Sequence, residues 1–144
     1  MTMPATDRTS ENSDSPVYYI SFERLAELHR SAVAVLAARR GPSSPSRLKP
    51  DNELSDPQEL VDEIAEHDAK DQDFIQPNMT IQEIVFRILL ARRNQPTQLH
   101  DLHYELTEKW ATPIRPINVT EVGLRRILDN DTYYGFTQAN SAGD

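Results

Sequence analysis

Hydrophobic residues recur at the spacing of an amphipathic helix in five stretches of this chain. The first stretch follows Ser21, a good helix N-cap, and ends at Gly41, which a proline follows. The apolar face of this stretch consists of Leu25, Leu28, Ala32, Val35 and Leu36. The pattern predicts one helix of about 19 residues, which either packs on the main domain or faces a partner. Because the β-prone run Val17–Ile20 precedes it, we expect residues 17–41 to form a strand and an amphipathic helix.

The second stretch begins at Asp56, an N-cap residue followed by a proline at the first helical position. Its apolar stripe is narrow, and most of its other positions are acidic. Residues 51–77 carry ten Asp or Glu and one Lys, a charge of -9, in a chain whose net charge is -8. Such a run is a solvated helix face, a patch for a basic protein surface, or a DNA-mimicking strip that competes for a basic site. We expect residues 42–75 to form an acidic linker with a short helix that adds little core.

Three further helices are predicted within residues 76–138. Thr80 caps the first, a proline turn at Pro96 separates it from the second, and Asn118 caps the third. The aromatic run Thr132–Thr137 then reads as a strand. The predicted fold class is therefore mainly α, with a three-helix winged-helix-like unit and a small β-sheet. The polar ends, residues 1–16 and 139–144, are expected to be disordered.

The predicted strand at 132–137 lacks an obvious hairpin partner, because the third helix leads almost directly into it. Three arrangements are open: the end of that helix, Arg125 to Leu128, is itself a strand, or the partner is Thr97–Leu99, or the partner is Val17–Ile20. We favour the last arrangement, because it gives the two tyrosines of Val17–Ile20 a place in a sheet.

Residues 79–136 resemble the HARE-HTH type of winged helix, best known from the delta subunit of bacterial RNA polymerase. The resemblance rests on Pro96, Leu99, Asp101, Leu102, Glu105 and Leu106, and on the strand Tyr134-Gly135-Phe136. It implies a domain associated with transcription or nucleic-acid handling, whose third helix would enter a major groove. That helix is a poor groove reader, because Glu121 and Asp129 each lie four residues from Arg125 and would pair with it.

The candidate residues for binding nucleic acid or a partner are therefore spread over several elements. They are Arg87, Arg92, Arg93, Arg115, Asn118, Arg125 and Arg126. An isoelectric point near 4.9 opposes non-specific DNA binding, in which phosphate neutralisation supplies most of the affinity.

The chain offers little for catalysis. It has no cysteine and only four glycines, so we expect no thiol chemistry and no phosphate-cradling loop. His100 and His103 lie three apart and could share a metal ion with a further ligand, but two partly exposed histidines are the simpler interpretation. We therefore expect a protein that is not an enzyme and needs no cofactor or metal.

The sequence thus predicts a cytoplasmic, non-catalytic binding protein tied to transcription or nucleic-acid handling. It shows no stretch apolar enough to span a membrane. A protein partner is expected, with a transcription complex as one candidate and nucleic acid as a second, and the oligomeric state is left open. The alternative function is a protein-interaction adaptor or assembly factor that uses the N-terminal helix and the acidic segment without binding nucleic acid.

Overall fold

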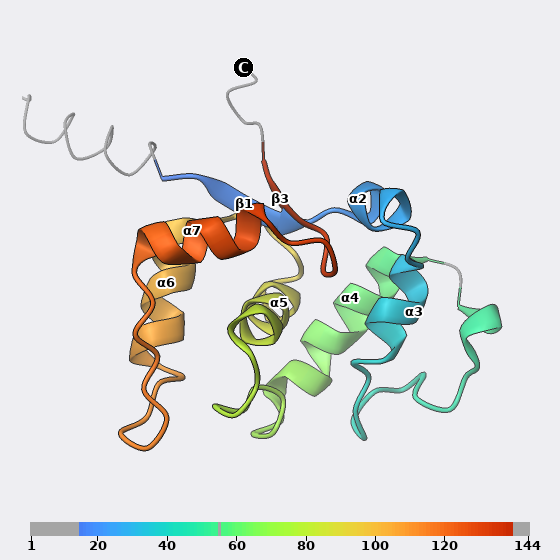
Figure 1. Cartoon of the computed structure of the whole chain (residues 1–144). Coiled ribbons are helices and arrows are strands. Elements are labelled where there is room, and N and C mark those ends of the chain that lie inside the picture. The colour runs from blue at the N-terminus through green and yellow to red at the C-terminus, as the bar shows by residue number, and fades with distance from the viewer. Residues whose placement is uncertain (1–14, 55, 140–144) are drawn as a thin grey trace, which may run out of the picture.

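The computed structural model of this protein describes residues 15–54 and 56–139. Within them, six α-helices pack with one three-stranded antiparallel sheet, which lies along one edge of the molecule, so the fold is mainly α as predicted (Figure 1). The strands are β1 (Val17–Ile20), β2 (Thr97–Gln98) and β3 (Phe136–Gln138). The helices are α2 (Phe22–Glu27), α3 (Ala32–Ala37), α4 (Pro57–Glu66), α5 (Ile81–Ala91), α6 (Leu99–Glu108) and α7 (Glu121–Asp129), with short 3-10 helices η1 (Asp51–Glu53) and η2 (Asp68–Lys70).

The N-terminal strand is the centre of the sheet. The strand order is β2-β1-β3, with Tyr18 opposite both Thr97 and Gln138. The expected pairing between the N-terminal and C-terminal strands is confirmed, and the short β2 pairs with the other edge of β1. Residues 15 and 16 were expected to belong to a disordered tail, but the Pro16 carbonyl accepts a hydrogen bond from the Leu99 amide at 2.7 Å. The rest of that predicted tail, and residues 140–144, lie outside the described residues.

The last strand begins later than its aromatic composition suggested, at Phe136 instead of Thr132. The carboxylate of Asp131 accepts hydrogen bonds from four successive amides, those of residues 133–136. This cluster of hydrogen bonds holds the chain in a turn. At Gly135, where the chain leaves the turn, the backbone has a φ of 84°. A Cβ at Gly135 would lie 2.9 Å from Leu25 Cγ, so a side chain there would meet α2.

The prediction of a single helix between Ser21 and Gly41 is wrong, because the chain forms two helices of six residues each. His29 has a φ of 61°, which ends α2, and Ser31 then caps α3 by accepting a hydrogen bond from the Ala34 amide. Ser21 caps α2 as expected. The break turns the apolar face of α3 toward α4, so Val35 and Leu36 are buried.

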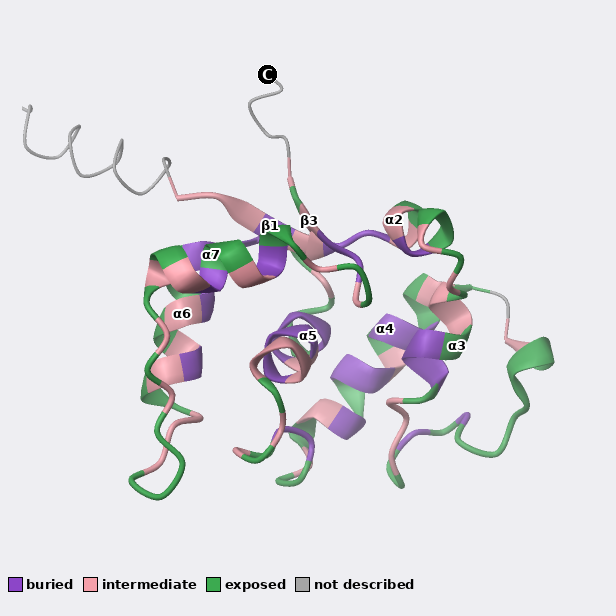
Figure 2. Ribbon diagram, viewed as in Figure 1, coloured by how far each residue is buried: buried purple, intermediate pink, exposed green. Residues whose placement is uncertain are grey.

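The acidic segment contributes more core than its composition suggested. Its helix starts after Asp56 as predicted, and every residue of its narrow apolar stripe is buried. The hydrophobic residues that this segment adds to the core are Leu60, Val61, Ile64, Phe74 and Ile75. They pack in one apolar cluster with α5, most of which is buried (Figure 2). A narrow stripe suffices here because α4 lies between two helices, α3 and α5.

The third helix of the C-terminal unit starts two residues later than predicted. Thr120, and not Asn118, is its N-cap, because the Thr120 hydroxyl accepts a hydrogen bond from the Gly123 amide at 2.9 Å. The helix keeps its shape to Asp129, so the alternative of a strand near Leu128 is excluded. In the sheet that results, β3 pairs with the distant β1.

Candidate binding surface

Arg87 lies in a half-buried cluster of charges on α5. Its Nε donates to Glu83 at 2.8 Å, and its Nη1 donates to the Phe74 carbonyl at 2.8 Å. Arg39, from the end of α3, also donates to Glu83, with its Nη2 2.8 Å from the carboxylate. Burial alone would raise the pKa of Glu83, but the hydrogen bonds from both arginines outweigh it and lower that pKa to about 2. Arg87 is therefore part of the packing and is not presented to a ligand.

Arg92 and Arg93, at the end of α5, each meet a carboxylate from another helix. Arg92 Nη2 lies 3.0 Å from Glu105 of α6. Arg93 Nη2 lies 2.7 Å from Glu66, and its Nη1 lies 3.7 Å from Asp62, both on the acidic helix α4. The acidic segment thus neutralises one of the predicted binding arginines.

On α7 the predicted pairing of Arg125 is confirmed on one side only. Arg125 Nε lies 3.5 Å from Asp129, whereas Glu121 contacts His100 Nδ1 at 2.9 Å. The Glu121 carboxylate raises the pKa of His100. The second histidine of the pair, His103, contacts the Val119 carbonyl through Nε2 at 2.6 Å. Both histidines therefore tie α6 to the start of α7, and no group of three or more metal-ligating side chains occurs within residues 15–54 and 56–139.

The three remaining predicted residues, Arg115, Asn118 and Arg126, are exposed, and their side chains make no contact with a charged group in the described parts of the chain. Arg115 and Asn118 line a hollow of about 270 Å³ beside Thr80 and Ile81 at the start of α5. Arg126 lines a second hollow, of about 520 Å³, which Gln82 borders from the same helix turn. The first turn of α5 therefore lies between two hollows, each with one unpaired guanidinium.

Two exposed apolar side chains, Val122 and Ile114, are sequence neighbours of residues that line these hollows. Val122 is 67% exposed and lies one helical turn before Arg126 on α7. Ile114 is 89% exposed and directly precedes Arg115, in the loop that extends beyond the end of α6 (Figure 1). Tyr133 lines the second hollow and stacks under Arg30, whose Cζ lies 3.6 Å from the ring centroid.

We use the term docking face for the surface that these residues form. It comprises Ile81, Gln82, Arg115, Asn118, Val122, Arg126 and Tyr133. Three of these residues, Arg115, Asn118 and Arg126, were predicted from the sequence as binding candidates, whereas the apolar ones were not. The exposure of Val122 could have been predicted from its position in the helix. It lies two residues after the N-cap Thr120 and is not on the face that Leu124 and Leu128 bury.

No family model matches this chain, and neither the curated proteins nor the solved structures compared with it give a match. Across the described residues, none of the helices combines the length and the apolar character needed to cross a bilayer.

Proposed function

We propose that this protein is a non-catalytic binding module that docks onto another protein through the docking face. The observation that supports this proposal most strongly is that most of the candidate arginines already form ion pairs within the molecule. Of the six arginines predicted as binding candidates, four are paired with carboxylates of the same molecule: Arg87, Arg92, Arg93 and Arg125. A DNA ligand would have to compete with each pair, since phosphate contacts supply most non-specific affinity.

The docking face instead has the composition of a protein interface. Exposed aliphatic and aromatic groups lie beside two unpaired arginines, and Tyr and Arg are enriched in protein–protein interfaces. The resemblance of residues 79–136 to the HARE-HTH type leads us to propose a partner from the transcription apparatus, an inference from analogy of fold.

The test is photo-crosslinking from single positions of the full chain inside cells. We expect a crosslinker at Val122 to capture one discrete protein, and Arg126→Glu to reduce its yield by about tenfold. Leu48 is the matched position, because it is 85% exposed but lies outside the docking face, and Arg47→Glu is the matched charge reversal. Equal capture from both positions, or capture of nucleic acid alone, would refute the proposal.

A second function, DNA binding under control of the acidic helix, is suggested by the contacts of Arg93 with Asp62 and Glu66. It predicts that Asp62→Asn with Glu66→Gln increases affinity for duplex DNA at low salt. The full chain is required for this test, because a fragment that starts at residue 76 lacks the central strand β1.

A further inference from the structure

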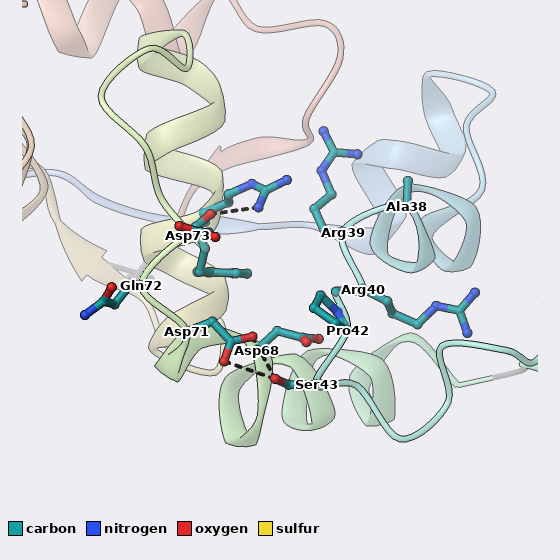
Figure 3. A pocket seen from close by; sticks show the side chains of 12 residues that line it. Ala38, Arg39, Arg40, Pro42, Ser43, Asp68, Asp71, Gln72 and Asp73 are labelled. Carbon is teal, nitrogen blue, oxygen red and sulfur yellow. Dashed lines mark hydrogen bonds between the residues drawn. The ribbon is translucent and has the colours of Figure 1, made fainter.

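A cavity of about 440 Å³ separates the end of α3 from the segment that follows α4 (Figure 3). One wall comes from residues 38–43, the other from Asp68 and residues 71–74, and Arg87 of α5 completes it. Its volume lies within the roughly 300–1,000 Å³ range of small-molecule sites. It shares no residue with the docking face, so its role is independent of the function proposed above.

Asp68 is the unusual member of this cavity. Its side chain is almost completely buried, with 2% of the residue exposed, and neither carboxylate oxygen has a hydrogen-bond partner in the described structure. Burial of a charge without a partner is strongly unfavourable, so buried carboxylates are normally paired or bind a cation. Figure 3 shows Asp68 and Asp71 reaching toward the segment that carries Pro42 and Ser43.

The arginines that line the cavity are engaged elsewhere. Arg39 and Arg87 share Glu83, as described above. Arg40 donates to the carbonyls of Ala37 and Ser46, and its Nη2 lies 3.8 Å from Asp51. None of the three therefore supplies a hydrogen bond to Asp68.

The charge balance around the cavity favours a cationic ligand. Three carboxylates line it, those of Asp68, Asp71 and Asp73, together with three guanidiniums. When Glu83 and Asp51 are included as the partners of those guanidiniums, five carboxylates face three guanidiniums. A bare metal ion is a poor candidate, because no group of three or more metal-ligating side chains is found in residues 15–54 and 56–139.

We propose that this cavity binds an organic cation, a guanidinium or a primary ammonium group, through the carboxylate of Asp68. Asp71, whose carboxylate accepts from Ser43 Oγ at 2.8 Å, lies beside it, and Phe74 supplies an apolar wall. Gly41 keeps the site open, because a Cβ at this position would lie 3.2 Å from Asp68 Oδ1. The cation is either a free small molecule or the side chain of an Arg or Lys in a peptide, since both present the same group.

Calorimetric and NMR titrations of the full chain test this proposal with three probes. N-butylguanidinium represents the free cation, acetyl-Gly-Arg-Gly-amide the peptide side chain, and N-butylurea the neutral isostere. We expect saturable binding of one or both cations, none of the urea, and shifts of the amide signals of Gly41 and Asp68. The cation that binds more tightly identifies the source of the ligand.

Two variants of the cavity and one control complete the experiment. Asp68→Asn keeps the shape and removes the charge, so it should weaken cation binding by about tenfold or more. It should also raise the melting temperature of the ligand-free protein, because it removes an unpaired buried charge. Gly41→Ala should weaken binding by narrowing the site, whereas Asp101→Asn, an exposed carboxylate on α6, should change neither property.

Three results would overturn the proposal. They are the absence of saturable cation binding, binding that Asp68→Asn leaves unchanged, and a melting temperature that falls in Asp68→Asn. The last result would show that the carboxylate serves packing and not a ligand.

Discussion

The hydroxyl of Tyr18 donates a hydrogen bond to Asp129 Oδ1 at 2.6 Å, between residues 111 positions apart in the sequence. It joins the central strand to the last turn of α7, the helix that carries part of the docking face. Burial, and then the bond to Asp129, raise the pKa of Tyr18, so the hydroxyl remains a donor at neutral pH. The position of α7 therefore depends on an N-terminal strand that lies far from it in the chain.

Tyr18→Phe removes this bond but keeps the ring in the core. We expect the free energy of unfolding to fall by about 1–3 kcal/mol, the usual effect of losing a hydrogen bond to a charged acceptor. Urea denaturation of the full chain measures it. Tyr19→Phe is the control, because Tyr19 is only half-buried, and an equal loss in both variants would contradict a specific role for Tyr18.

Asn94 extends the hydrogen-bonding of the central strand with its side chain. Its amide accepts from the Ile20 N–H and donates to the Ile20 carbonyl, both at 2.8 Å, while its backbone has a φ of 59°. Asn94→Gly keeps the backbone conformation and should cost about 1–3 kcal/mol of stability, whereas Asn94→Ala should cost about 1 kcal/mol more. Arg93→Gly, at a φ of 58°, is the control for the backbone, and it should cost less than Asn94→Gly because it removes only exposed ion pairs with Asp62 and Glu66. Equal stability of the Gly and wild-type proteins would contradict this role.

The cluster around Glu83 predicts a loss of stability in acid. The pKa of Glu83, about 2, lies below the value of 4.5 expected in the unfolded chain. The stabilisation is therefore complete above about pH 5 and disappears as the pH falls toward 2. Tyr134 also donates to Glu83, at 2.9 Å, and burial followed by this bond raises the pKa of Tyr134 to about 12. The network remains in one charge state across neutral pH.

Chemical denaturation at pH 7 and pH 3 tests this dependence. Glu83 should account for a loss of about 2 kcal/mol between the two conditions. In Glu83→Gln the protein should be less stable at pH 7, because two half-buried arginines lose their charged partner, and the difference between the two pH values should shrink by about that amount. Glu108→Gln alters an exposed carboxylate and should keep the wild-type pH dependence. An unchanged pH dependence in Glu83→Gln would contradict the role of this cluster.

Local signals in the sequence predicted much of this fold. Ser21, Asp56 and Thr80 are helix caps in the structure as they are in the sequence pattern. The pairing of the two terminal strands was also predicted, because each needed a partner. The break at His29 was missed, since apolar spacing alone fits a continuous helix, and the second cap at Ser31 was the available signal.

The candidate sites were less predictable, because they depend on contacts between distant segments. The sequence identified Arg93 as a cationic binding candidate, but its neutralisation by α4 follows from how two helices pack. Asp68 is one of ten acidic residues in its segment, and nothing local distinguishes it. Its carboxylate is buried close to Gly41, four residues beyond α3, where a Cβ would lie 3.2 Å from Asp68 Oδ1.

We propose that this molecule docks on protein, because most of the arginines in its described residues are paired with its own carboxylates. An NMR titration of the isotopically labelled full chain with duplex DNA at low salt tests it most directly. We expect no saturable shifts anywhere in the chain, and only weak, non-saturating changes near Arg115 and, within α7, near Arg126. Saturable shifts along α7, together with an affinity that falls steeply as salt is added, would contradict it.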